Sequence, residues 1–103
     1  MSDQSKSKQL EADLNFIKMA DLFINQANKQ CEQADHQLVN ASMLYASARF
    51  SAFITASMSE SKQSYEAGMD QAIEFYMAEF KKMLQEHMQQ YSVVFDKKPQ
   101  YPY

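Results

Sequence analysis

The sequence MDQAIEFYMAEFKKMLQEHMQQY, residues 69–91, has the clearest periodicity in the chain. Its apolar side chains recur every three or four residues, with charged and amide side chains between them. An α-helix has about 3.6 residues per turn, so this spacing gathers the apolar positions on one face. The positions on this face are Met69, Ala72, Ile73, Tyr76, Met77, Phe80, Met83, Leu84, His87, Met88 and Tyr91. The pattern predicts a helix over about residues 62–92.

Residues 10–34 have the same kind of pattern with a wider apolar face. Helical intervals of three, four or seven residues separate Leu10, Ile17, Ala20, Ile24, Ala27, Cys31 and Ala34. Phe16 and Phe23 flank this series and widen the face. We therefore predict an amphipathic helix over about residues 10–34. Asp35 and Asn40 are both candidate N-caps of the following helix, because their side-chain oxygens can accept hydrogen bonds from its first backbone N–H groups.

Residues 38–57 are apolar or small on nearly every side of a helix. Small residues let neighbouring backbones approach closely, and the aromatic side chains between them fill the remaining volume. The pattern predicts a second helix that lies at the centre of the fold, with neighbours on more than one face. A serine-rich connection follows, in which Ser61 or Ser64 is expected to cap the third helix.

Glycine and proline, the usual markers of turns, are scarce. The chain has one Gly and two Pro, both prolines in the last five residues, so we expect few turns and long helices. At 103 residues it has the size of one domain. We predict an all-α fold, an antiparallel up-down-up three-helix bundle over residues 10–92. Residues 1–9 are expected to be disordered, and residues 93–103 to form an extended tail.

Charge and composition disfavour several function classes. A net charge of -3 and a pI of about 5.3 have the wrong sign for binding nucleic-acid phosphates. The most apolar stretch, residues 38–58, has Arg49 at its centre, which disfavours insertion into a membrane. Residues 1–9 lack the apolar run of a signal peptide, and the lone Cys31 cannot form an internal disulfide. We therefore expect a cytoplasmic protein that binds neither nucleic acid nor membranes.

The sequence contains no recognisable catalytic or metal-binding motif. A chain whose one glycine is Gly68 cannot supply a P-loop, a dinucleotide-binding fingerprint or a nucleophile elbow. Four residues of metal-ligating types lie close together, namely Cys31, Glu32, Asp35 and His36. No second Cys pair or Glu-x-x-His motif supports a metal site there. We predict no catalytic residue, no metal and no cofactor, and an enzyme is the third-ranked hypothesis.

Arg49 is the most informative single residue. It is the one arginine in the chain, and it shares a helix face with Tyr45 and Phe53 at intervals of four residues. Its charge must be exposed, or paired with a carboxylate or a ligand. We favour an ion pair, for which the candidate acids are Asp21, Asp70 and Glu74. The alternatives are simple exposure and a ligand or partner contact made by Arg49, Tyr45 and Phe53.

Eight methionines are a high number for 103 residues. Most of them fall on apolar helix faces, so filling gaps in a core is the favoured interpretation, and an adaptable surface for a partner is the alternative. The aromatic and Met positions on the first two helices are more numerous than a small core needs. The first functional hypothesis is therefore a non-enzymatic interaction module that forms a homo-oligomer or binds another protein. The second is a small-anion or ligand-binding domain that uses Arg49 with Tyr45 and Phe53.

The residues around Arg49 also carry a family resemblance. Residues 20–28, 43–53 and 72–76 resemble a family of small bacterial proteins catalogued as a domain of unknown function. The most specific part is the motif Leu-Tyr-Ala-x-Ala-Arg-Phe-x-Ala-Phe, which residues 44–53 match fully, and the similarity covers about residues 16–91. The resemblance implies a compact bacterial helical domain, and it implies no catalytic residue, substrate or cofactor.

Overall fold

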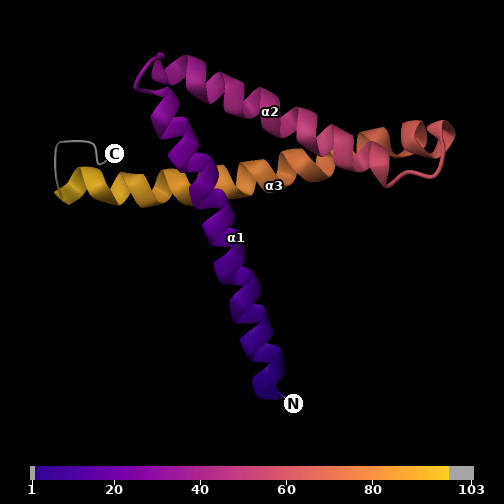
Figure 1. Ribbon diagram of the computed structural model, residues 1–103, viewed down its shortest axis with the longest axis horizontal. Coiled ribbons are helices and arrows are strands. Elements are labelled where there is room, and N and C mark those ends of the chain that lie inside the picture. Colours follow the sequence, from indigo (N-terminus) through magenta and orange to yellow (C-terminus); the bar gives the residue numbers. More distant parts are fainter. Residues whose placement is uncertain (1, 98–103) are drawn as a thin grey trace. The chain divides into compact units, whose positions relative to one another are not determined.

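A computed structural model describes the backbone of residues 2–97 and the side chains of residues 5–96. The chain forms three helices, α1 (Ser2–Gln30), α2 (His36–Ser57) and α3 (Lys62–Lys97) (Figure 1). The described residues are 90% helical and include no strand. The predicted all-α class and the number of helices are therefore confirmed, and the antiparallel up-down-up arrangement stays a prediction.

α1 begins at Ser2, about eight residues before the predicted start, so the expected disorder is corrected for residues 2–9. This segment contains no Gly or Pro, and its polar residues can continue the helix that the apolar face begins. Gln9 Nε2 donates a hydrogen bond to Asp13 Oδ1 at 3.0 Å. This bond between side chains four residues apart stabilises the helix where the polar segment meets the apolar pattern. At its other end α1 stops at Gln30, four residues before the predicted end.

α3 continues to Lys97, so the expected extended tail is corrected for residues 93–97. Val93 and Val94 have lower helix propensity than Ala, but the difference is only a few tenths of a kcal/mol per residue. The helix ends two residues before Pro99, in keeping with the clash between a proline ring and a helical residue that precedes it. The expected tail over residues 98–103 lies outside the described residues, as does Met1.

Asp35 is the N-cap of α2. The Gln37 N–H donates to Asp35 Oδ2 at 3.0 Å, and the Val39 N–H donates to the Asp35 carbonyl at 3.0 Å. The side chain thus satisfies one of the free N–H groups of the first turn, while the carbonyl starts the helical ladder. Of the two predicted caps, Asp35 is confirmed, and Asn40 lies inside α2.

The chain divides into two compact units, Met1–Ala52 and Phe53–Tyr103. The boundary falls inside the continuous helix α2, so the first unit holds α1 with most of α2, and the second holds the last turn of α2 with α3. The expectation of a single three-helix domain over residues 10–92 stays a prediction.

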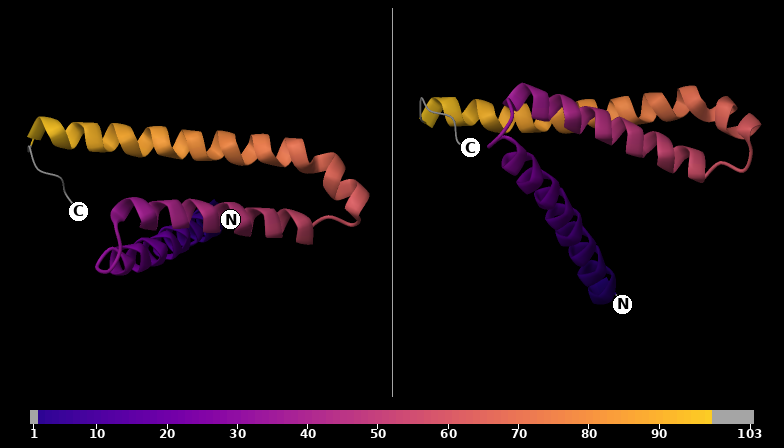
Figure 2. Two further views of the ribbon diagram at one scale, coloured as in Figure 1. Left: turned by 90° about the horizontal axis from the view of Figure 1, so that it is seen from above. Right: turned by 45° about the horizontal axis from the view of Figure 1, so that its top comes forward.

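Covered side chains lie mainly next to the two turns between the helices. Figure 2 shows these turns from two further directions. Among the described side chains, Val39 alone is buried, with 4% of its surface exposed. In the first unit, the half-buried residues beside it in sequence are Ala27, Cys31 and Ala34. In the second unit, the half-buried residues flanking the turn are Ile54, Thr55, Ser59, Tyr65, Gly68 and Ala72. Away from the turns, only Ser51 and Val94 are half-buried among the described residues.

α2 is not the buried central helix that its composition predicts. Leu38, Tyr45 and Phe50 each expose more than 60% of their surface, and among α2 residues only Val39 is buried. The expectation that α2 has neighbours on more than one face stays a prediction.

Candidate interaction surface

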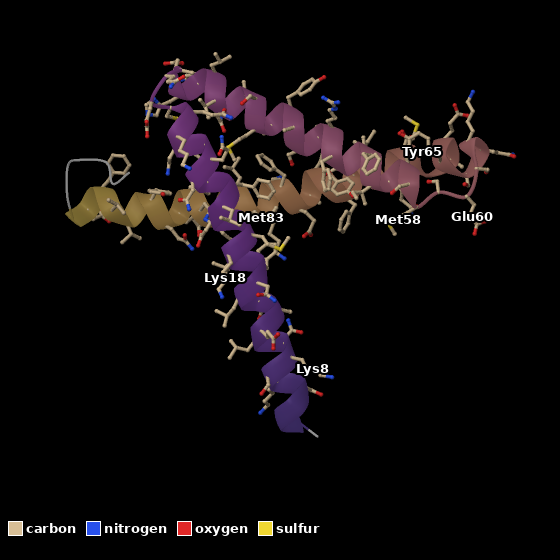
Figure 3. All side chains as sticks on the ribbon, viewed as in Figure 1. Lys8, Lys18, Met58, Glu60, Tyr65 and Met83 are labelled. Atoms are coloured by element: carbon tan, nitrogen blue, oxygen red, sulfur yellow. The ribbon has the colours of Figure 1, made fainter. Side chains whose placement is uncertain are left out.

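α1 carries a broad apolar surface that the rest of its unit leaves open. Seven large side chains of this surface are each at least 49% exposed, namely Leu10, Leu14, Phe16, Ile17, Met19, Phe23 and Ile24. We call them the α1 face. By helical position they span more than half of the circumference, with polar residues such as Lys18, labelled in Figure 3, on the other side. One packed helix covers a stripe of about 100°, so the α1 face has room for two neighbours.

α3 carries a second apolar surface in its C-terminal half. Its large side chains are Phe80, Met83, Leu84, Met88, Tyr91 and Phe95, and each exposes between 43% and 65% of its surface. We call them the α3 face; Met83 is labelled in Figure 3. His87 lies between Leu84 and Tyr91 on the same face by helical position, and it is exposed. The sequence pattern favours a core location for the Met side chains of this face, whereas the structure exposes them.

The aromatic residues of α3 also occur outside this face. The rings of Phe75 and Tyr76 are 5.5 Å apart between centroids with an interplanar angle of 71°, an edge-to-face arrangement. Phe75 is 60% exposed and Tyr76 is 38% exposed, so this pair adds apolar surface on the N-terminal half of α3.

Tyr45, Arg49 and Phe53 lie on consecutive turns of one side of α2, and all three are exposed. Arg49 makes no hydrogen bond or ion pair with Asp21 or with any other described residue of the first unit. The favoured pairing with Asp21 is therefore not observed. Asp70 and Glu74 belong to the second unit, and pairing with them stays a prediction. The three residues form an exposed row on a helix, and their use as a ligand or partner contact stays a prediction.

The cluster of metal-ligating residue types does not form a metal-ion site. Over residues 5–96, whose side chains are described, no three His, Cys, Asp or Glu side chains are placed to hold an ion. Asp35 is engaged in capping α2. Cys31 is a half-buried free thiol in the turn before it.

The helices that the structure describes do not combine the length and the apolar character needed to cross a lipid bilayer.

Comparison with protein families shows which family the chain resembles. A family model described as a protein of unknown function (DUF3144) matches residues 16–92. No curated protein and no solved structure matches the chain. The matched segment contains α1 from Phe16 onward, all of α2, and α3 as far as Ser92. Most of the α1 face and of the α3 face therefore lies within the matched segment.

Proposed function

The chain belongs to the family of proteins of unknown function DUF3144, and we propose that it acts as a small, non-enzymatic helical interaction module that associates with itself. The exposed apolar surface of α1 and α3 is the observation that carries the proposal. The proposal includes two further features that the resemblance implies. They are the bacterial origin of the chain and the Leu-Tyr-Ala-x-Ala-Arg-Phe-x-Ala-Phe motif as a mark of the family.

The size of this surface exceeds what a monomer ordinarily presents to water. With exposed fractions of 49% to 69%, the seven side chains of the α1 face expose roughly 800 Å², at about 200 Å² for a large apolar side chain. The largest apolar patch of a typical monomer is about 300 to 600 Å². A partner that covered the α1 face would remove this surface from water, which favours association.

The composition of the exposed surface also supports an interface. Aromatic and Met side chains are enriched at protein interfaces, whereas Lys, Glu and Asp are depleted there. The α1 face holds two Phe and one Met, and the α3 face holds two Phe, one Tyr and two Met. Met side chains are unbranched and flexible, so they adapt to a partner surface of irregular shape.

The mass of the protein in solution tests this proposal. Sedimentation equilibrium or light scattering after size exclusion, over a wide concentration range, is expected to give a multiple of the chain mass of 11.9 kDa. Circular dichroism of the same samples measures whether the helices are formed. A helical, cooperatively folded protein that stays monomeric at every concentration would overturn the proposal.

The proposal includes a cytoplasmic location. The free thiol of Cys31 supports it, because unpaired cysteines persist in reducing compartments, where disulfides are rare.

A second candidate function is binding of a small anion or ligand by Arg49 with Tyr45 and Phe53. The exposed guanidinium, unpaired with the acids of its own unit, supports it. Titration with inorganic phosphate, monitored by NMR, tests this function. Saturable shifts around Arg49 that disappear in Arg49→Gln are the expected result, and unsaturated shifts spread over the surface would contradict it.

A further inference from the structure

α3 is much longer than α2, the helix that precedes it. The 36 residues of α3 exceed the 22 residues of α2 by 14, and a four-residue connection, Met58–Ser61, joins the end of α2 to the start of α3. At about 1.5 Å per residue, α2 spans about 33 Å and α3 about 54 Å. Because the two helices start from one short turn, α2 is too short to lie along the last 14 residues of α3.

The apolar pattern of α3 continues into the residues beyond the reach of α2. Phe80 is followed by Leu84, His87, Tyr91 and Val94 at intervals of four, three, four and three residues, and we call these five positions the seam. This is the heptad spacing that lets one helix pack along another over several turns. Leu84 and Tyr91 expose 44% and 54% of their surface, so much of the seam is open.

We infer that residues 83–95 of α3 pair with the same residues of a second copy in antiparallel orientation. The inference rests on the proposed self-association, and it names the surface and the orientation. In heptad terms, Leu84 and Tyr91 are a positions of the seam, and His87 and Val94 are d positions. In an antiparallel pair, each a position lies opposite a d position of the other copy. Leu84 of one copy then lies opposite Val94 of the other, and His87 lies opposite Tyr91, with the two-fold axis near Gln89.

The area available agrees with a stable pair. Five side chains of the α3 face lie in this segment, Met83, Leu84, Met88, Tyr91 and Phe95, and their exposed fractions of 43% to 65% amount to roughly 600 Å² per copy at about 200 to 250 Å² for each whole side chain. Two copies together have up to about 1,200 Å² to bury, at the lower end of the range of about 1,200 to 2,000 Å² for specific protein interfaces.

The polar residues of the seam favour the antiparallel orientation. A parallel pair places His87 beside His87 and Tyr91 beside Tyr91, whereas an antiparallel pair places each His87 beside a Tyr91, whose hydroxyl can form a hydrogen bond with the imidazole ring. The layer of His87 and Tyr91 places polar atoms in the seam, and a polar layer fixes the register of paired helices.

Cysteine cross-linking distinguishes the orientations in the full chain. In a Cys31→Ser background, Met88→Cys lies next to the axis and is expected to form a covalent dimer with itself when copper phenanthroline supplies the oxidant. Leu84→Cys is expected to form none, because the two copies of residue 84 are about 15 Å apart along the pair, beyond the about 7 Å limit for a disulfide. A mixture of Leu84→Cys with Val94→Cys is expected to give the mixed dimer.

A disruptive substitution gives the second measurement. Tyr91→Asp is expected to raise the dissociation constant of the dimer at least tenfold, since it places a carboxylate in the seam. Gln89→Asp adds the same charge on the opposite side of α3 and is expected to change the constant less than threefold. Circular dichroism of both variants controls for loss of helix.

Three results would overturn the inference. Self-linking by Leu84→Cys indicates a parallel pair. A stable wild-type dimer that none of these variants links or weakens places the interface elsewhere, and the proposed self-association then stands without this surface. A wild-type monomer with intact helices would contradict both the self-association and the pairing of α3. In that case, an intramolecular disulfide between Met88→Cys and a cysteine placed on the α1 face would show that α1 covers the α3 face.

Discussion

Ser61 and Ser64 cap the N-terminus of α3 reciprocally. The Ser64 N–H donates to Ser61 Oγ at 3.1 Å, and the Ser61 N–H donates to Ser64 Oγ at 3.1 Å. The Ser61 carbonyl also accepts the first ladder bond of the helix, from the Tyr65 N–H at 2.9 Å. Two backbone donors that a helix start leaves free are therefore satisfied by two hydroxyls, and both predicted cap residues have a role.

Replacing Ser61 tests this cap. Ser61→Ala is expected to lower the free energy of unfolding by about 1 kcal/mol, because the Ser64 N–H loses its acceptor. Ser61→Asp keeps an acceptor and adds a negative charge at the helix N-terminus, so it should retain wild-type stability or exceed it. Urea denaturation measures both variants. Equal stability of Ser61→Ala and wild type would mean that water replaces the hydroxyl without cost.

Gly68 weakens the second turn of α3 without any need for a glycine. Its φ is not positive, and a Cβ added there meets no described atom within 4 Å. Gly68→Ala is expected to raise the unfolding free energy by about 0.5 to 1 kcal/mol, because alanine has less backbone freedom to lose. Ala67→Gly, one residue earlier, should lower it by a similar amount. A loss of stability in Gly68→Ala would reveal a neighbour that needs the space.

Val39 and Val93 form a matched pair for measuring burial. Val39 is 4% exposed beside the first turn, whereas Val93 is 51% exposed on α3. Val39→Ala is expected to cost about 2 kcal/mol for the buried methyl groups and the space they leave. Val93→Ala should change stability by less than about 0.5 kcal/mol, as substitutions at exposed positions usually do. A similar cost for both in urea titrations would indicate that Val93 becomes covered in the assembled protein, and dilution would then remove the cost at Val93.

The local features of this chain are predictable from sequence because short-range chemistry determines them. Asp35 and Ser61 are cap residues by side-chain type, and the three-four spacing from Met69 to Tyr91 identifies α3 without reference to any neighbour. Helix ends such as Ser2 depend on small propensity differences among polar residues, so they are placed less well.

Burial is a different kind of question, because an apolar face does not specify its partner. The spacing of Phe16 and Phe23 indicates a face that needs covering, and the same pattern fits a core or an interface. The same ambiguity applies to the Met side chains, because their helical spacing also fits either a core or an interface. Helix length adds the missing information at the end of α3, since α2 is too short to cover Leu84 to Phe95.

Substitution of Arg49 distinguishes a structural role of this residue from a binding role. Because the guanidinium is exposed and does not pair with Asp21, Arg49→Met is expected to leave the unfolding free energy within about 0.5 kcal/mol of wild type. A double-mutant cycle by chemical denaturation should give a coupling to Asp21 below about 0.5 kcal/mol. The same cycle with Asp70 and Glu74 tests the other two predicted ion pairs. Coupling above that value with either acid would restore the structural interpretation. Small coupling with all three, together with loss of phosphate binding or of self-association in Arg49→Met, would assign the residue to the corresponding contact.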